Sequence, residues 1–240
     1  MVTCRPDISY AVIKLTQFNN APAEIHYNAI LDIYRYLKAT ASDGIQYWRP
    51  TINASLAHVP PTEPESEQYS VNIPPEHSNI DSTYGYVDSD WAGNTNTRKS
   101  VSGVSFLLAG APIIFKTIHQ KTVALSSTEA EFYALSEAGK LALYIRSILN
   151  ELHIPQEAAT AIYEDNQGCL FMAAAKKPTK KTRHVEIRHY ALLDWIDQDL
   201  LEIKKIHTHD NCSDTLTKPL AKTLFYRHTD TLMGRRPPLP

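Results

Sequence analysis

Four carboxylates occupy positions that are typical of a binding site for a divalent cation. Asp88 and Asp165 each end a predicted strand. Glu131 lies in the first turns of a long predicted helix, and Asp214 opens the last predicted helix. The ends of strands are where α/β sheets hold their ligands. Carboxylates without accompanying cysteine or paired histidine ligands suit a hard cation such as Mg²⁺ or Mn²⁺. Two such ions close together can activate a water molecule and stabilise the leaving oxygen of a phosphodiester.

The position of Glu131 within its helix gives the strongest of these signals. Glu131 falls in phase with the apolar face of the helix, whereas Glu129 and Glu137 do not. A carboxylate on a buried face is costly unless it is paired or bound to a metal. The alternative is that Glu131 is a first-turn acid favoured by the helix dipole, with Ser126 and Glu129 forming a capping box. The apolar face expected from the spacing comprises Ala134, Ala138, Leu141, Ile145, Ile148 and Leu152.

Other chemistries fit the same residues less well. His207 and His209 with Cys212 could bind zinc, but no fourth ligand is near. Asp88 and Asp90 are not adjacent, as the two acids of a polymerase loop would be. An integrase-type triad would end on a glutamate, and the order here is reversed.

The pattern of predicted elements indicates a mixed α/β fold in which helices cover a sheet. Three strands come first, and a Gly-Ala-Pro turn at 110–112 joins the second to the third as a hairpin. The three strands are expected to be antiparallel, and the chain then runs helix, strand, helix, helix, strand, helix, which is typical of a mixed α/β sandwich. We expect strands at 84–88, 101–109, 113–117, 161–164 and 201–207, and helices at 127–152, 170–175, 186–198 and from about 213.

The chain divides by composition into four parts. Two short amphipathic helices in residues 1–48 cannot bury both their apolar faces alone, so they need a partner in the rest of the chain or upstream of it. Residues 49–83 contain six prolines and read as a linker. We expect the main domain at 84–222 and a tail at 223–240.

Composition and charge exclude several classes of protein. The chain has 240 residues, 43% hydrophobic and 21% charged, which is typical of a globular protein. Three separated cysteines without a CxxC pair argue against a disulfide scaffold. The uncharged run at 100–115 is too short to span a membrane, and we expect neither a secretion signal nor a membrane partner.

A net charge of −2 leaves no bulk positive field for nucleic acid, so any such site must be a local patch. One candidate is the cation run at 176–184, which carries no acid and precedes a helix. Such a run can contact phosphates, although a solvated charged loop is the alternative. Its members are Lys176, Lys177, Lys180, Lys181, Arg183 and His184.

Six short motifs occur in a fixed order, and together they carry a resemblance. Residues 84–220 resemble the ribonuclease H domain of copia-type LTR retrotransposon polyproteins. The sequences RPDISYAV at 5–12 and YLKAT at 36–40 resemble the end of the reverse transcriptase in the same polyproteins. The six motifs are YVDSDWAG at 86–93, RKSVSG at 98–103, ALSSTEAE at 124–131, YEDNQ at 163–167, RH at 183–184 and DTLTKPL at 214–220.

The resemblance implies a ribonuclease H-like α/β fold, with a five-stranded mixed sheet of order 3-2-1-4-5 preceded by a short helical segment. It also implies a nuclease that uses two Mg²⁺ ions, or Mn²⁺, to cut the RNA strand of RNA–DNA hybrids during reverse transcription. A histidine in the region of His207 or His209 would assist product release. Asp90 also fits the family pattern as a candidate accessory acid, and the sequence alone does not settle its role beside Asp88. The catalytic and metal-binding residues implied are Asp88, Glu131, Asp165 and Asp214.

The resemblance further implies partners and a location. The expected partners are an RNA–DNA hybrid and the upstream reverse transcriptase of the same polyprotein. The expected location is a retrotransposon particle in the cytoplasm, or the nucleus. The competing interpretation is an inactive or decaying copy that acts at most as a nucleic-acid-binding domain, which intact acids do not exclude.

Overall fold

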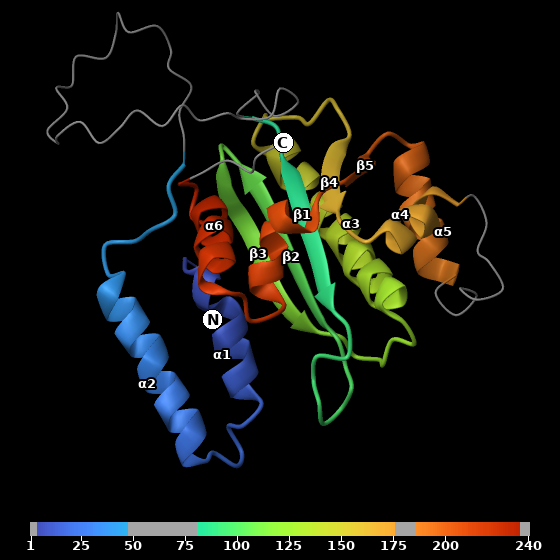
Figure 1. Ribbon diagram of the computed structural model, residues 1–240. Helices are drawn as coiled ribbons and strands as arrows, with labels where there is room; N and C mark the ends of the chain where they lie inside the picture. The colour runs from blue at the N-terminus through green and yellow to red at the C-terminus, as the bar shows by residue number, and fades with distance from the viewer. Residues whose placement is uncertain (1–3, 48–80, 176–185, 236–240) are drawn as a thin grey trace, which may run out of the picture.

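A computed structural model describes residues 4–47, 81–175 and 186–235, and its centre is a five-stranded sheet (Figure 1). The strand order is β3-β2-β1-β4-β5, which confirms the predicted order. β1 is antiparallel to β2 and parallel to β4, and β4 is parallel to β5. The strands are β1 (Tyr84–Asp90), β2 (Val101–Leu108), β3 (Ala111–His119), β4 (Thr160–Glu164) and β5 (Leu201–Lys205).

Helices α3 (Ser127–Glu151), α4 (Gln167–Ala174) and α5 (Glu186–Asp197) cover one face of the sheet (Figure 1), which we call the α3 face. Because successive strand residues point to opposite faces, Val87 packs on this face, whereas Tyr84 and Tyr86 do not. The core of this face is mainly aliphatic and includes Val104, Phe106, Phe132, Leu135, Ile162 and Leu192.

The buried stripe of α3 differs from the expected one. Ile148 is 36% exposed and Leu152 is 62% exposed, while Leu149 is buried. The sequence prediction was therefore wrong about the last turns of this helix. The 25 residues of α3 extend about 38 Å at 1.5 Å per residue, which exceeds the length of the strands that it covers. Leu149 still packs in the core, but Leu152, just beyond the helix, has little sheet to pack against.

The opposite face, which we call the η5 face, is covered by short pieces. The 3₁₀ turn η5 (Cys212–Leu216) lies on β1 and β2, and α6 (Lys222–Leu232) packs on η5. The sequence pattern predicts one helix from about 213 and a tail from 223. The structure instead has a 3₁₀ turn followed by a separate helix, because Pro219 restricts the residue before it and supplies no amide hydrogen.

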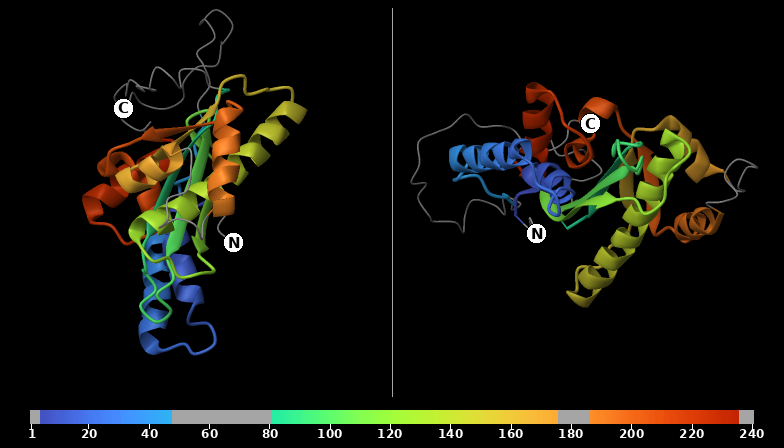
Figure 2. Two further views of the ribbon diagram at one scale, coloured as in Figure 1. Left: turned by 90° about the vertical axis from the view of Figure 1, so that its right-hand side faces the viewer. Right: turned by 90° about the horizontal axis from the view of Figure 1, so that it is seen from below.

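The N-terminal segment also lies on the η5 face. It contains the 3₁₀ turn η1 (Pro6–Ile8) and the helices α1 (Ser9–Thr16) and α2 (Glu24–Ala39). The buried hydroxyls of Ser9 and Thr117 are 3.0 Å apart and tie α1 to β3. The Gln46 amide donates to the Met233 carbonyl. The view from below shows α1 between the sheet and α2 (Figure 2).

η1 is therefore buried against the rest of this chain, whereas α1 docks on β3 with only Ser9 buried. α2 has no buried residue, and its Ile25, Tyr27 and Tyr34 are 60% exposed or more. The predicted linker at 49–83 lies largely outside the described residues. No helix in the described ranges is both long and apolar enough to cross a membrane.

Candidate active site

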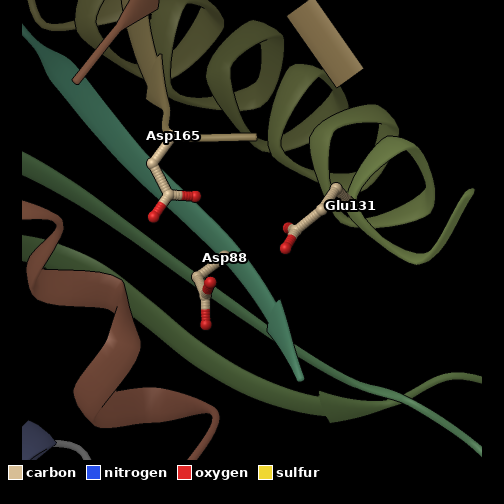
Figure 3. Close-up of side chains that lie close together, drawn as sticks. All are labelled: Asp88, Glu131 and Asp165. Atoms are coloured by element: carbon tan, nitrogen blue, oxygen red, sulfur yellow. The ribbon is translucent and has the colours of Figure 1, made fainter. Parts of the chain in front are cut away.

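Asp88, Glu131 and Asp165 form a compact acidic cluster that we call the acid triad. One carboxylate oxygen of each lies within 4.8 Å of the others. It is the one group of three or more histidine, cysteine, aspartate and glutamate residues in the described ranges whose ligand atoms all lie this close to one another. Figure 3 shows the three side chains arriving from β1, from α3 and from the segment after β4. The set is purely oxygen, which suits a hard cation.

The register of β1 and β4 places two of these acids side by side. The two strands are parallel, and Tyr86 is opposite Tyr163. Asp88 follows Tyr86 by two residues and Asp165 follows Tyr163 by two residues, so the two aspartates lie at matching positions along the neighbouring strands. The carboxyl ends of neighbouring parallel strands thus deliver both aspartates to one edge.

The start of α3 supplies the third acid and contains both of the features weighed from the sequence. Ser126 caps the helix by accepting from the Glu129 amide, and the Glu129 carboxylate accepts from the Leu125 amide at 2.7 Å. Glu129 is buried in this role, contrary to the helical phase prediction. The cap is complete without Glu131, which lies 5% exposed with Oε2 lacking a hydrogen-bond partner.

A further acid, Glu164, lies beside the triad and was not singled out from the sequence. It is fully buried at the end of β4, its Oε1 accepts from the Asn166 amide, and its Oε2 has no hydrogen-bond partner. Burial raises the pKa of both Glu131 and Glu164 well above the ordinary range, and each also experiences neighbouring carboxylates. Strand alternation was the available signal, because residue 164 shares the α3 face with Ile162.

Asp214, the fourth acid, lies beside the triad but is held by the chain's own cation. Lys218 Nζ lies 2.8 Å from Asp214 Oδ1 and 3.5 Å from Asp88 Oδ1, and the Thr217 hydroxyl donates to the Asp88 carboxylate. Burial and Asp88 raise the pKa of Asp214 to about 8, against the opposing effect of Lys218. Burial lowers the Lys218 pKa, but the two aspartates outweigh it and raise the net value.

Gly103 permits this arrangement. It is opposite Asp88 on β2, and a Cβ there would lie 2.7 Å from Thr217 Cγ2 and 2.8 Å from the Ser213 carbonyl oxygen. A side chain at this position would therefore push η5 off the sheet. The glycine of the motif at 98–103 thus brings Asp214, Thr217 and Lys218 to the edge where Asp88 lies.

The other candidate residues lie around this centre without joining the triad. Asp90 is half-buried, and burial raises its pKa, while the nearby Lys218 and Lys14 lower it. His207 and His209 are exposed, with stacked rings at 5.3 Å. The cation run at 176–184, with Lys176, Lys177, Lys180, Lys181, Arg183 and His184, lies outside the described residues.

The zinc hypothesis fails on the position of the cysteine. Cys212 is fully buried under the sheet, with its sulfur 3.9 Å from the Ser105 hydroxyl, while the two histidines face solvent. The three side chains therefore do not share a site. His207 has a local role instead, because its Nδ1 accepts from the His209 amide in the turn before η5.

The strand order, together with carboxylates at the ends of β1 and β4 and at the start of α3, defines a ribonuclease H-like domain. No protein-family model matches the chain. It is 31% identical to the retrovirus-related Pol polyprotein from transposon RE1 of Arabidopsis thaliana, over 98% of this chain and 14% of that protein. It is 30% identical to the corresponding polyprotein from transposon TNT 1-94 of Nicotiana tabacum, over 94% of this chain and 15% of that protein.

The chain thus belongs to the Pol polyproteins of copia-type retrotransposons, of which it spans about a seventh, and it contains their ribonuclease H domain. It is also 35% identical to secreted RxLR effector protein 161 of Plasmopara viticola, over 60% of this chain and 82% of that protein. Among solved structures, LC11-RNase H1 gives a TM-score of 0.45 at 14% identity, over 57% of this chain and 93% of that one. A score below 0.5 adds nothing to the strand order and the acid triad.

Proposed function

We propose that this chain is the ribonuclease H of a retrotransposon polyprotein, and that it hydrolyses the RNA strand of RNA–DNA hybrids internally during reverse transcription. The observation that carries the proposal is Glu131. Its Oε2 is buried without a hydrogen-bond partner, and one of its carboxylate oxygens lies within 4.8 Å of those of Asp88 and Asp165, which come from two neighbouring parallel strands and their ends. A buried carboxylate among other carboxylates is costly until a cation joins it, so the arrangement favours metal-dependent chemistry.

The residues fit Mg²⁺, or Mn²⁺ in its place, because every donor is a carboxylate oxygen. Two bound ions would supply an activated water and stabilise the leaving oxygen of the phosphodiester. Asp88 lies between the other acids and would serve both ions, with Glu131 and Asp165 on one side and Asp214 on the other. Thr217 orients the Asp88 carboxylate by donating a hydrogen bond to it.

The partners follow from the same proposal. The cation run at 176–184 would contact hybrid phosphates without reading sequence. The upstream reverse transcriptase would deliver the hybrid, either in a cytoplasmic particle or in the nucleus. His207 and His209 border this edge, since Asp165 accepts a hydrogen bond from Thr208 between them, and they remain candidates for assisting product release.

The test is cleavage of a hybrid labelled on its RNA strand by the purified chain, with Mg²⁺, with Mn²⁺ and with EDTA. We expect internal cuts with either metal, none with EDTA, and none in the DNA strand. Asp88→Asn should abolish cleavage while retaining the circular dichroism spectrum. Hybrid binding without cleavage under all conditions would contradict the proposal and support the inactive copy instead.

A further inference from the structure

Lys218 lies inside the proposed metal site. Its ammonium group contacts Asp214 at 2.8 Å and Asp88 at 3.5 Å, and both carboxylate side chains are at most 3% exposed. The Lys218 side chain itself is 32% exposed. It therefore reaches from the surface to two buried acids, and one positive charge already lies between them.

The triad side of the same site has no such charge. Within the described residues, Glu131 and Asp165 form no ion pair with a lysine or arginine, and Oε2 of Glu131 has no hydrogen-bond partner. Asp88 belongs to both sides, because it joins the triad and also contacts Lys218. The site thus offers one cation position that is open and one that a side chain holds.

We infer that Lys218 is a built-in competitor for the second metal ion, so that the two ion positions differ intrinsically in affinity. This inference rests on the proposed function. A divalent ion that binds between Asp88 and Asp214 must displace the ammonium, because two cations at one position repel each other. The open position, between Asp88, Glu131 and Asp165, holds no side-chain cation, so an ion there needs no such displacement and experiences Lys218 only as a neighbouring charge.

The surroundings give the displaced side chain a place to go. A groove of about 590 Å³ adjoins the site, and Lys218 forms part of its wall. The groove lies between the N-terminal helices and the segment from η5 to α6, with Tyr10, Lys14 and Tyr226 among its lining residues. Lys218 can therefore withdraw into it without crossing the core, while Pro219 fixes the backbone behind it.

The test measures Mn²⁺ binding to the intact chain by electron paramagnetic resonance and calorimetry, without substrate. The wild-type chain should show one tighter site and a second one weaker by about tenfold or more, the scale of losing one contact charge near a protein surface. Lys218→Met should strengthen the second site to within a few-fold of the first. Lys218→Arg, which keeps the charge, should behave like the wild type.

The matched control is Lys222→Met, which removes the same charge from the same groove at an exposed position. It should leave both sites unchanged. Identical two-site binding in the wild type and in Lys218→Met would overturn this inference alone. No Mn²⁺ binding by either protein, with circular dichroism showing both to be folded, would overturn the proposed metal site together with it.

Discussion

The two faces of the sheet contribute to the candidate active site in opposite ways. The α3 face contributes Glu131, buried with a carboxylate oxygen that has no partner, and Glu164 beside it. The η5 face contributes Asp214, whose carboxylate forms an ion pair with the ammonium group of Lys218. Asp88 lies between the two. One half of the candidate site thus has carboxylates with no side-chain cation beside them, and the other half already holds the ammonium group of Lys218.

The two faces also differ in how they are covered. A single 25-residue helix closes much of the α3 face over an aliphatic core. The η5 face is assembled from a 3₁₀ turn, an 11-residue helix and the N-terminal segment, around tyrosines 84, 86 and 163. Short pieces distant in sequence depend on close contacts more than one long helix does, so the η5 face should be the more sensitive to local changes.

The largest expected effect separates the acids of the two faces. Glu131→Gln removes a ligand whose charge no side chain offsets, and several kcal/mol of lost charge stabilisation corresponds to about a thousandfold slower cleavage. Asp214→Asn should cost less, about ten- to a hundredfold, as for groups that support metal ligands. The measurement is single-turnover cleavage of a labelled hybrid.

The control for that comparison is Glu137→Gln on the same helix, where Glu137 is ion-paired with Lys140 at the surface and lies outside the triad. Its cleavage rate should match that of the wild type. Equal losses for Glu131→Gln and Asp214→Asn would show that the two halves of the site do not differ as described.

The next effect concerns the approach of η5 to the sheet. Gly103→Ala would place a Cβ within 3.0 Å of Thr217, Ser213 and Leu216, and overpacking of this kind costs about 1–3 kcal/mol of unfolding free energy. Urea unfolding measures it. Gly44→Ala is the matched control, because nothing lies within 4 Å of a Cβ there. If Gly103→Ala left the free energy of unfolding unchanged, η5 would not pack against Gly103 as closely as the structure shows.

The pH dependence of stability tests the unpartnered acid of the α3 face. Burial raises the folded-state pKa of Glu131, so as the pH rises above the ordinary pKa of a glutamate the native state retains a proton that the unfolded state releases. Without metal, this contribution to stability is therefore full at acid pH and is lost as the pH rises. Glu131→Gln removes the contribution of this one group to the pH dependence of stability, which is up to about 1.4 kcal/mol of unfolding free energy per pH unit.

Urea unfolding in EDTA at several pH values provides the measurement, read as the stability of Glu131→Gln minus that of the wild type. This difference should increase from pH 5 to pH 8, whereas Glu137→Gln should give a flat line. A flat line for Glu131→Gln would mean that the carboxylate is not buried as described.

The smallest expected effect concerns the N-terminal segment. The Ser9 and Thr117 hydroxyls are buried together, so a double-mutant cycle with Ser9→Ala and Thr117→Val should give a coupling energy of about 1 kcal/mol. Tyr27→Ser on α2, where the side chain is 60% exposed, should leave stability nearly unchanged. Zero coupling between Ser9 and Thr117 would mean that α1 does not dock on β3 in solution.

Local sequence patterns were sufficient to predict the features in which a residue's environment depends mainly on its neighbours in the sequence. The hairpin of β2 and β3 follows from the turn signal at Gly110 between apolar runs, although the turn itself is Ala109-Gly110 and the predicted turn residues Ala111 and Pro112 belong to β3. The cap of α3 follows from the spacing of Ser126 and Glu129. Patterns were insufficient for α6, because its helical stripe is weakly apolar and its burial comes from packing on η5. Patterns were also insufficient for the end of the buried stripe of α3, because the length of the sheet decides where the helix stops being covered.

The sequence by itself determined the succession of strands and helices along the chain, and it singled out the four acids through motifs that follow one another; the strand order in the sheet came from the family resemblance of those motifs. It could not determine that Asp88, Glu131 and Asp165 form one cluster while Asp214 pairs with Lys218. Each of these contacts joins residues from different elements, and the register of β1 with β4 and the close approach allowed by Gly103 set the distances. A lysine in a sequence is by default a solvated charge. Only the fold makes Lys218 the counterion of two buried carboxylates, because burial strengthens a charge interaction that water would otherwise screen.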